Sequence, residues 1–209
     1  MRYRKVSPGF SLIELVVAVA ILMTLAAIAI PNLAIIVANY KLDASGRSIV
    51  SLMEAGRILA VKTNQAQYVL FDATRPPGIA FVASDPSASY ALGDLSMELA
   101  SGLLSPTSGL PDHQQLDAYL GSSVVVKVGT AVGFNARGLP CIAGNTAGTL
   151  CRQVDPVLSG TPGFLWFVKG PATNAWEAIS VTPAGRIKNW RLSQIDATTN
   201  SCGYPACWN

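Results

Sequence analysis

The sequence has little charge and almost no histidine. Only 13% of its 209 residues are charged, and the one histidine, His113, lies in the polar segment 110–114. The chain also lacks the G-x-S-x-G, H-E-x-x-H and Walker A patterns of large enzyme classes, and its carboxylates are scattered. We therefore expect no catalytic site and no cofactor, and we interpret His113 as a solvated loop residue. Half of the residues are hydrophobic, so the low charge does not indicate a disordered chain.

What the chain does have is one long apolar segment near its N-terminus, with a single acid at the start. Leu15 to Ile30 are interrupted only by Thr24, and Glu14 opens the run. Three basic residues precede it: Arg2, Arg4 and Lys5. About 20 apolar residues span a bilayer and basic flanks stay cytoplasmic, so we predict a single span with a cytoplasmic N-terminus. A carboxylate inside a membrane helix costs about 2.5 kcal/mol or more, which marks Glu14 as functional.

Two simpler interpretations of this segment are open. A secretory signal peptide could be cleaved at residues 27–29, but the apolar run 12–30 has 19 residues. Such signals have an apolar run of about 7–15 residues. The apolar character also continues past Pro31 to residue 37. A generic membrane anchor explains the length but leaves Glu14 without a role.

The string Gly9-Phe10-Ser11-Leu12-Ile13-Glu14-Leu15 resembles the class III signal of type IV pilins and type II secretion pseudopilins. The resemblance implies that a membrane-bound prepilin peptidase cuts after Gly9, that Phe10 is then N-methylated, and that the apolar helix is retained. Pro31 matches the place where such helices carry a proline, and it should loosen the helix because it removes a backbone hydrogen bond. In a filament, Glu14 would pair with the freed amine of a neighbouring subunit and set the register.

After this segment the spacing predicts an amphipathic helix over 41–63. Apolar residues recur at intervals of three, four and seven: Leu42, Ile49, Leu52, Met53 and Leu59. Charged residues fall between them, so the apolar face is expected to pack on a sheet. Gly46 and Gly56 weaken the helix by about 1 kcal/mol each.

The remainder is predicted to be a β-rich head. Residues 72–123 are irregular, with a short helix over 95–103, and short apolar runs at 68–71 and 79–82 suit strands. Residues 124–192 contain β-branched and alternating runs and are predicted to form a β-meander. Within it we assign Trp176 to the core and leave the role of Trp208 open.

The fold class that follows is α+β, with a long N-terminal helix packed on an antiparallel sheet. Half of the helix lies in the membrane and half is amphipathic. The predicted divisions are a leader (1–9), a transmembrane and assembly helix (10–40), and an exported head (41–209) that ends in a disulfide tail (193–209).

All four cysteines lie in the last third of the chain: Cys141, Cys151, Cys202 and Cys207. An even number in an exported domain favours disulfides. Four cysteines allow three connectivities, and our first prediction pairs sequence neighbours, Cys141 with Cys151 and Cys202 with Cys207. A zinc site is the weaker alternative because the chain has no C-x-x-C pair, so no metal is predicted.

Three further segments resemble the GspH/FimT family of pseudopilins and minor pilins. They are residues 133–140 (GFNARGLP), 181–188 (VTPAGRIK) and 55–57 (AGR). The resemblance implies a minor subunit at or near the tip of a type II secretion pseudopilus or a type IV pilus, where it helps to initiate the filament. The implied partners are other pseudopilins or minor pilins, the major (pseudo)pilin and secreted cargo. The implied location is the inner membrane, with the head in the periplasm.

An alternative within this family is the capture of DNA during natural transformation. Some FimT-type minor pilins bind DNA through a G-R-x-R motif near the C-terminus, which Gly185-Arg186-Ile187-Lys188 with Arg191 matches in part. Strand alternation would place Arg186 and Lys188 on one face and Arg191 on the other. Lys188 stands where the motif has arginine, and about three phosphate contacts give weak, salt-dependent binding. The simpler interpretation is an exposed strand with solubilising charges, although residues 124–209 carry seven basic and three acidic residues.

Overall fold

The computed structural model describes residues 11–72, 78–99, 103–104, 110–121, 125–127, 131–141, 151, 163–170, 175–192 and 207–208. Within these residues the chain forms two helices and ten strands. It divides into two compact units, which we call the first unit (residues 1–37) and the second unit (residues 38–209).

Helix α1 (Leu12–Thr63) fills the described part of the first unit after Ser11. The described side chains up to residue 37 are exposed, and two polar ones, Thr24 and Asn32, bond to the helix itself. Thr24 Oγ1 donates to the carbonyl oxygen of Ile21 at 2.8 Å, and Asn32 Nδ2 donates to that of Ile28 at 3.2 Å. These bonds satisfy polar groups that an apolar environment would otherwise leave unpaired. The helix continues through Pro31, and the loosening expected there stays a prediction.

In the second unit, α1 buries one stripe of side chains. Its members recur every three or four residues, the spacing of one helical face: Leu42, Ser45, Gly46, Ile49, Leu52, Met53, Gly56 and Ala60. The amphipathic helix predicted for 41–63 is therefore confirmed, together with its end at Thr63.

Two sheets pack against this stripe. The first sheet has the order β3-β2-β1-β6-β7 and is antiparallel throughout. The second has the order β10-β9-β8-β4, and β5 adds to β8 as a parallel neighbour. The strands of the first sheet are β1 (Gln67–Asp72), β2 (Ile79–Ala83), β3 (Ser96–Glu98), β6 (Ala131–Phe134) and β7 (Pro140–Cys141). Those of the second are β4 (Leu103–Leu104), β5 (Val125–Lys127), β8 (Gly163–Lys169), β9 (Trp176–Val181) and β10 (Ile187–Arg191).

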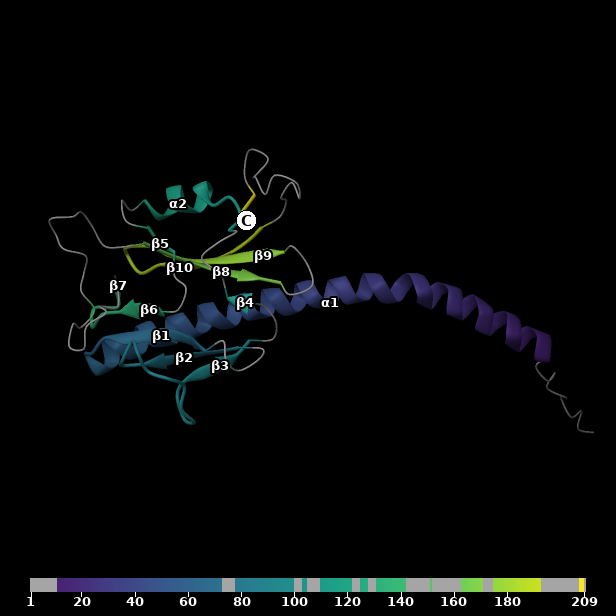
Figure 1. Ribbon diagram of the computed structural model, residues 1–209, viewed down its shortest axis with the longest axis horizontal. Coiled ribbons are helices and arrows are strands. Elements are labelled where there is room, and N and C mark those ends of the chain that lie inside the picture. The colour runs from purple at the N-terminus through teal and green to yellow at the C-terminus, as the bar shows by residue number, and fades with distance from the viewer. Residues whose placement is uncertain are drawn as a thin grey trace, which may run out of the picture. The chain divides into compact units, whose positions relative to one another are not determined.

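The main core lies where α1 meets both sheets. It joins Ile49 and Met53 of the helix to Val69 of the first sheet and to Trp166 and Ile179 of the second. Figure 1 shows this part of α1 running between the strands of the two sheets. The predicted α+β fold, with the helix packed on antiparallel sheets, is confirmed.

A second core lies on the other face of the second sheet. There α2 (Gln114–Leu120) packs Leu116 and Leu120 against alternate residues of β8, Leu165 and Phe167. Trp176 is buried in this core, as predicted. Trp208, whose role the sequence left open, is buried there too.

Three local expectations for the head are wrong. Residues 96–98 form strand β3 and not part of a helix, because pairing with β2 outweighs the helix propensity of residues such as Met97 and Glu98. The region 72–123 also contains β4 and α2, so it is less irregular than predicted, whereas the strands expected over 68–71 and 79–82 are confirmed as β1 and β2. In the described part of 124–192, the predicted meander is limited to β8, β9 and β10, because β5 pairs parallel with β8 while β6 and β7 join the first sheet.

Candidate functional site

The acid that the sequence singles out lies in the first turn of α1. Glu14 is exposed, and Leu15 N–H donates to the carbonyl oxygen of Ser11 at 3.2 Å, which starts the helix. The first turn leaves backbone N–H groups without helical partners, so a carboxylate there is electrostatically favoured. Gly9 and Phe10 lie outside the described residues, so cleavage and N-methylation stay predictions.

The helix that follows Glu14 presents apolar side chains on every side. Leu22 is 64% exposed and Met23 is 67% exposed. Among the described residues, α1 alone is long and apolar enough to cross a membrane, as judged by length and composition. An exposed apolar surface of this size marks contact with a membrane or with other proteins.

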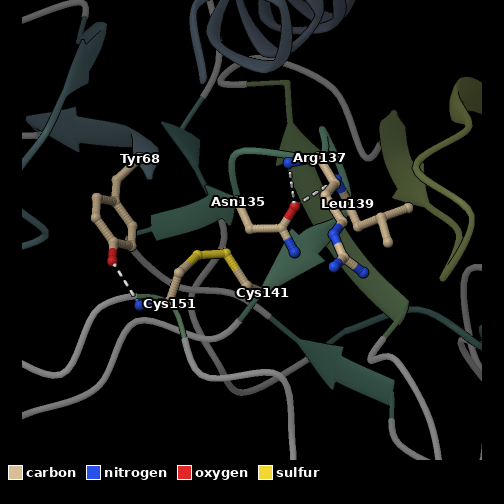
Figure 2. Close-up of a disulfide and its surroundings, with 6 residues drawn as sticks. All are labelled: Tyr68, Asn135, Arg137, Leu139, Cys141 and Cys151. Atoms are coloured by element: carbon tan, nitrogen blue, oxygen red, sulfur yellow. Dashed lines mark hydrogen bonds between the residues drawn. A yellow bond between two sulfur atoms is a disulfide. The ribbon is translucent and has the colours of Figure 1, made fainter. Parts of the chain in front are cut away.

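The second unit holds a disulfide between Cys141 and Cys151, with a Cα–Cα distance of 5.2 Å. Cys141 is buried at the end of β7, and the backbone N–H of Cys151 donates to Tyr68 Oη at 3.1 Å (Figure 2). This is the first of the two pairings predicted. Cys207 is also disulfide-bonded, but Cys202 lies outside the described residues, so the second pairing stays a prediction.

The segments 133–140 and 181–188 each contain a three-residue hairpin loop of the same design. In the first, Asn135 N–H donates to the Leu139 carbonyl oxygen at 2.9 Å, and Gly138 takes φ of 73°. In the second, Thr182 N–H donates to the Arg186 carbonyl oxygen at 2.9 Å, and Gly185 takes φ of 80°. Such loops need a left-handed residue at the third position, for which glycine is best suited.

A polar side chain hydrogen-bonds to the backbone within each loop. Asn135 Oδ1 accepts from the backbone N–H groups of Arg137 at 2.9 Å and Leu139 at 3.1 Å (Figure 2). Thr182 Oγ1 accepts from the N–H of Arg186 at 3.0 Å. Asparagine and threonine often bond to the backbone in this way at turns.

Arg57 of α1 joins the two loops. Its Nη1 donates to the Gly185 carbonyl oxygen at 2.9 Å. A Cβ atom added to Gly185 would lie 2.8 Å from the Gly138 carbonyl oxygen, and one added to Gly138 would lie 3.2 Å from Arg57 Nε. The three segments with the GspH/FimT resemblance therefore meet at one point, where they hold the helix and both sheets together.

The three basic residues that the sequence suggests for DNA binding differ in their surroundings. Arg186 is exposed at the end of the second loop. Lys188 is half-buried, with Nζ 3.4 Å from the Trp190 ring centroid and 5.6 Å from that of Tyr119. Arg191 is exposed at the end of β10, opposite Glu177 in the strand register. A role in DNA binding stays a prediction for all three.

His113 is not the solvated loop residue that we expected. Its side chain is 21% exposed and precedes α2, with Nδ1 2.8 Å from the Pro111 carbonyl oxygen. The ring also contacts Phe167 of β8 edge-on, with 5.8 Å between the centroids. The start of α2 packs on an aromatic strand, which no local pattern around residue 113 indicates.

Sequence reasoning missed the buried acid Glu177. It lies on β9 and is 0% exposed, and Asn189 Nδ2 of β10 donates to its Oε2 at 3.1 Å. Burial raises the pKa of the Glu177 carboxyl, the Asn189 hydrogen bond opposes this, and the nearby Asp43 carboxylate adds to it. The only sequence signal is an acid at an alternate position of a strand that is otherwise mostly apolar.

Comparison with known families finds one match. A family described as the prokaryotic N-terminal methylation motif matches residues 4–30. This match supports a type IV pilin-like or pseudopilin subunit, and it implies processing by prepilin peptidase and assembly with other pilins. Together with the apolar helix it indicates membrane anchoring and a pilus-associated location. No curated protein and no solved structure matches the chain.

Proposed function

We propose that the chain is a minor subunit of a type II secretion pseudopilus or a type IV pilus, and that it acts at or near the filament tip during initiation. The observation that carries this proposal is the methylation motif over residues 4–30, which lies mostly on a helix that exposes an apolar surface and has Glu14 in its first turn. The tip position rests on the GspH/FimT resemblance. The head would then stand in the periplasm, with the N-terminus in the cytoplasm.

The mechanism is assembly, in three steps. Prepilin peptidase cuts between Gly9 and Phe10 and leaves a new amine four residues before Glu14. Glu14 then pairs with the amine of a neighbouring subunit, which offsets the cost of a carboxylate in an apolar environment. Residues 12–37, exposed in the isolated chain, become covered by the matching helices of other pilins. The head carries the contacts with minor subunits or secreted cargo.

The decisive test compares Glu14→Ala with Glu54→Ala, which removes an exposed acid from the other half of the same helix. We expect Glu14→Ala to stay in the membrane fraction and to be lost from sheared filaments, while Glu54→Ala assembles normally. Normal incorporation of Glu14→Ala would refute the pairing. Co-purification of the native chain with its filament would identify the secretion system or the pilus.

Processing is tested separately with Gly9→Ala and with Gly93→Ala, which changes an exposed glycine far from the leader. Co-expression with prepilin peptidase should shift the band of Gly93→Ala on a gel and leave that of Gly9→Ala in place. An N-terminus beyond residue 29 in the exported product would show a discarded signal peptide and refute the proposal.

A second candidate function is DNA capture, which the exposure of Arg186 and Arg191 favours. The test is a gel-shift titration of the full chain in detergent over a salt series, because phosphate contacts weaken as salt rises. Arg186→Ala should weaken binding and flatten the salt dependence, whereas Lys62→Ala, at the end of α1, should not. Equal binding by all three proteins would reject this site.

A further inference from the structure

The contact between α1 and the second sheet contains an acid and an amide directly over a glycine. A Cβ atom added to Gly46 would overlap Glu177 Oε2 and would lie 2.9 Å from Asn189 Nδ2 and 3.2 Å from Asn189 Oδ1. Gly46 thus lets both side chains rest on the helix backbone. All three residues belong to the second unit.

One half of this acid–amide pair is bonded and the other half is not. Asn189 Nδ2 donates to Glu177 Oε2, but Glu177 Oε1 and Asn189 Oδ1 are buried and have no hydrogen-bond partner among the described residues. Both atoms are acceptors when Glu177 is ionised. A proton on Oε1 would supply the donor that is missing and would remove the charge. A buried polar atom without a hydrogen-bond partner is costly, so a proton on Oε1 would stabilise this contact.

We propose that Glu177 and Asn189 form a proton-dependent latch over Gly46, which docks α1 on the second sheet when Glu177 is neutral and loosens this contact when Glu177 ionises. The latch stands on these contacts alone and does not depend on the proposed function. Gly46 lies two turns after the start of the second unit, whereas the stripe from Ile49 to Ala60 packs on apolar residues. Ionisation of Glu177 therefore loosens only the first turns of α1 in the second unit. The rest of the helix stays packed through its apolar stripe.

In the described part of the chain, no charged side chain forms an ion pair with Glu177. Asp43, on α1, repels it, and Arg47 is bonded to Asp43 at 2.6 Å with its side chain 75% exposed. Arg191, on β10, is exposed. Its attraction lowers the pKa of Glu177, but by less than burial raises it. On β8 the residue opposite Glu177 is Val168, which is apolar.

The sign of the pH dependence follows from the raised pKa of Glu177, whose main cause is burial. The folded state then binds more protons than the unfolded state at pH values between the unfolded pKa and the raised folded one. Stability falls with rising pH across that window and is fully present below the unfolded pKa. Within the window the unfolding constant rises by at most about tenfold for each pH unit.

The test uses the full chain in detergent micelles, unfolded by urea at pH values from about 4 to 9. All four tryptophans lie in the second unit, so their fluorescence reports on its unfolding. For the wild type we expect an unfolding constant that increases with pH. Glu177→Gln, which keeps the shape and cannot ionise, should lose this dependence and be the more stable protein at high pH. Glu98→Gln, in which an exposed acid of β3 is replaced, should behave like the wild type.

Two further measurements keep the outcome decisive. Infrared spectroscopy should detect a protonated carboxylic acid in the wild type at pH values within this window and not in Glu177→Gln. Asn189→Asp places a second acid in the contact and should steepen the pH dependence. Wild-type stability that does not decrease over the window would overturn the latch. So would failure of Glu177→Gln to fold, since that would show that the contact needs the carboxylate.

Discussion

Gly185→Ala should destabilise the second unit far more than an equivalent change at another left-handed glycine. The perturbation adds one methyl group to a residue with φ of 80°. The added Cβ would lie 2.8 Å from the Gly138 carbonyl oxygen and 3.3 Å from Arg57 Cζ. Backbone cannot move aside as a flexible side chain can, so the contact must separate the two hairpin loops.

The expected loss in the free energy of unfolding has two contributions. A left-handed conformation costs an alanine about 1–2 kcal/mol, and overpacking of a tight contact costs about 1–3 kcal/mol more. Gly121→Ala is the matched control, because Gly121 has φ of 58° and no atom within 4 Å of its added Cβ. Gly121→Ala should lose only the free energy that the left-handed conformation costs. A domain has about 5–15 kcal/mol of stability in total, so both variants should still fold and remain measurable.

The assay is urea unfolding of the full chain in detergent micelles, followed by tryptophan fluorescence at one pH. We expect Gly185→Ala to lower the free energy of unfolding by about 2–5 kcal/mol, against about 1–2 kcal/mol for Gly121→Ala. Equal losses in the two variants would mean that the loops do not meet at Gly185, and would refute the junction at Arg57.

Three further variants probe the same unit. Arg57→Lys should lower the free energy of unfolding by about 1.5–3 kcal/mol in the same assay, because the guanidinium bond to Gly185 is lost; an unchanged midpoint would contradict it. Replacing Cys141 and Cys151 together by serine should cost about 2–3 kcal/mol, since their bond closes a short loop, and equal stability would show that it does not constrain the chain. Gln115→Ala should cost about 1–3 kcal/mol, because Gln115 both donates to and accepts from the backbone of Trp208. A loss no larger than that of Gln114→Ala, on the exposed side of α2, would contradict this role.

The N-terminal third of the fold could be predicted because its signals are local. A helix that buries Leu42, Ile49 and Met53 repeats its apolar residues every three to four positions, whatever it packs against. The two hairpin loops are local too, since Gly138 and Gly185 mark left-handed positions in short turns.

The missed features depend on partners far away in the chain. Strand β3 exists because β2 offers it an edge, and β6 joins β1 after more than 50 intervening residues. The residues within these short strands do not indicate which sheet edge each strand will pair with. Glu177 was missed for the same reason, because Gly46, on which its carboxyl group rests, lies about 130 residues earlier in the chain.

The position of Lys188 bears on the proposed binding of DNA. Its ammonium group lies 3.4 Å from the Trp190 ring centroid, an attraction of about 0.5–2 kcal/mol that would weaken if the group turned to a phosphate. Arg186 is exposed and makes its hydrogen bond to Thr182 through the backbone N–H, so a phosphate contact of its guanidinium would leave this bond intact. Arg191 lies at the other end of β10, next to the Glu177 strand position. The part of the G-R-x-R resemblance that suits a phosphate is therefore its first arginine, while the lysine serves the aromatic packing of the second core.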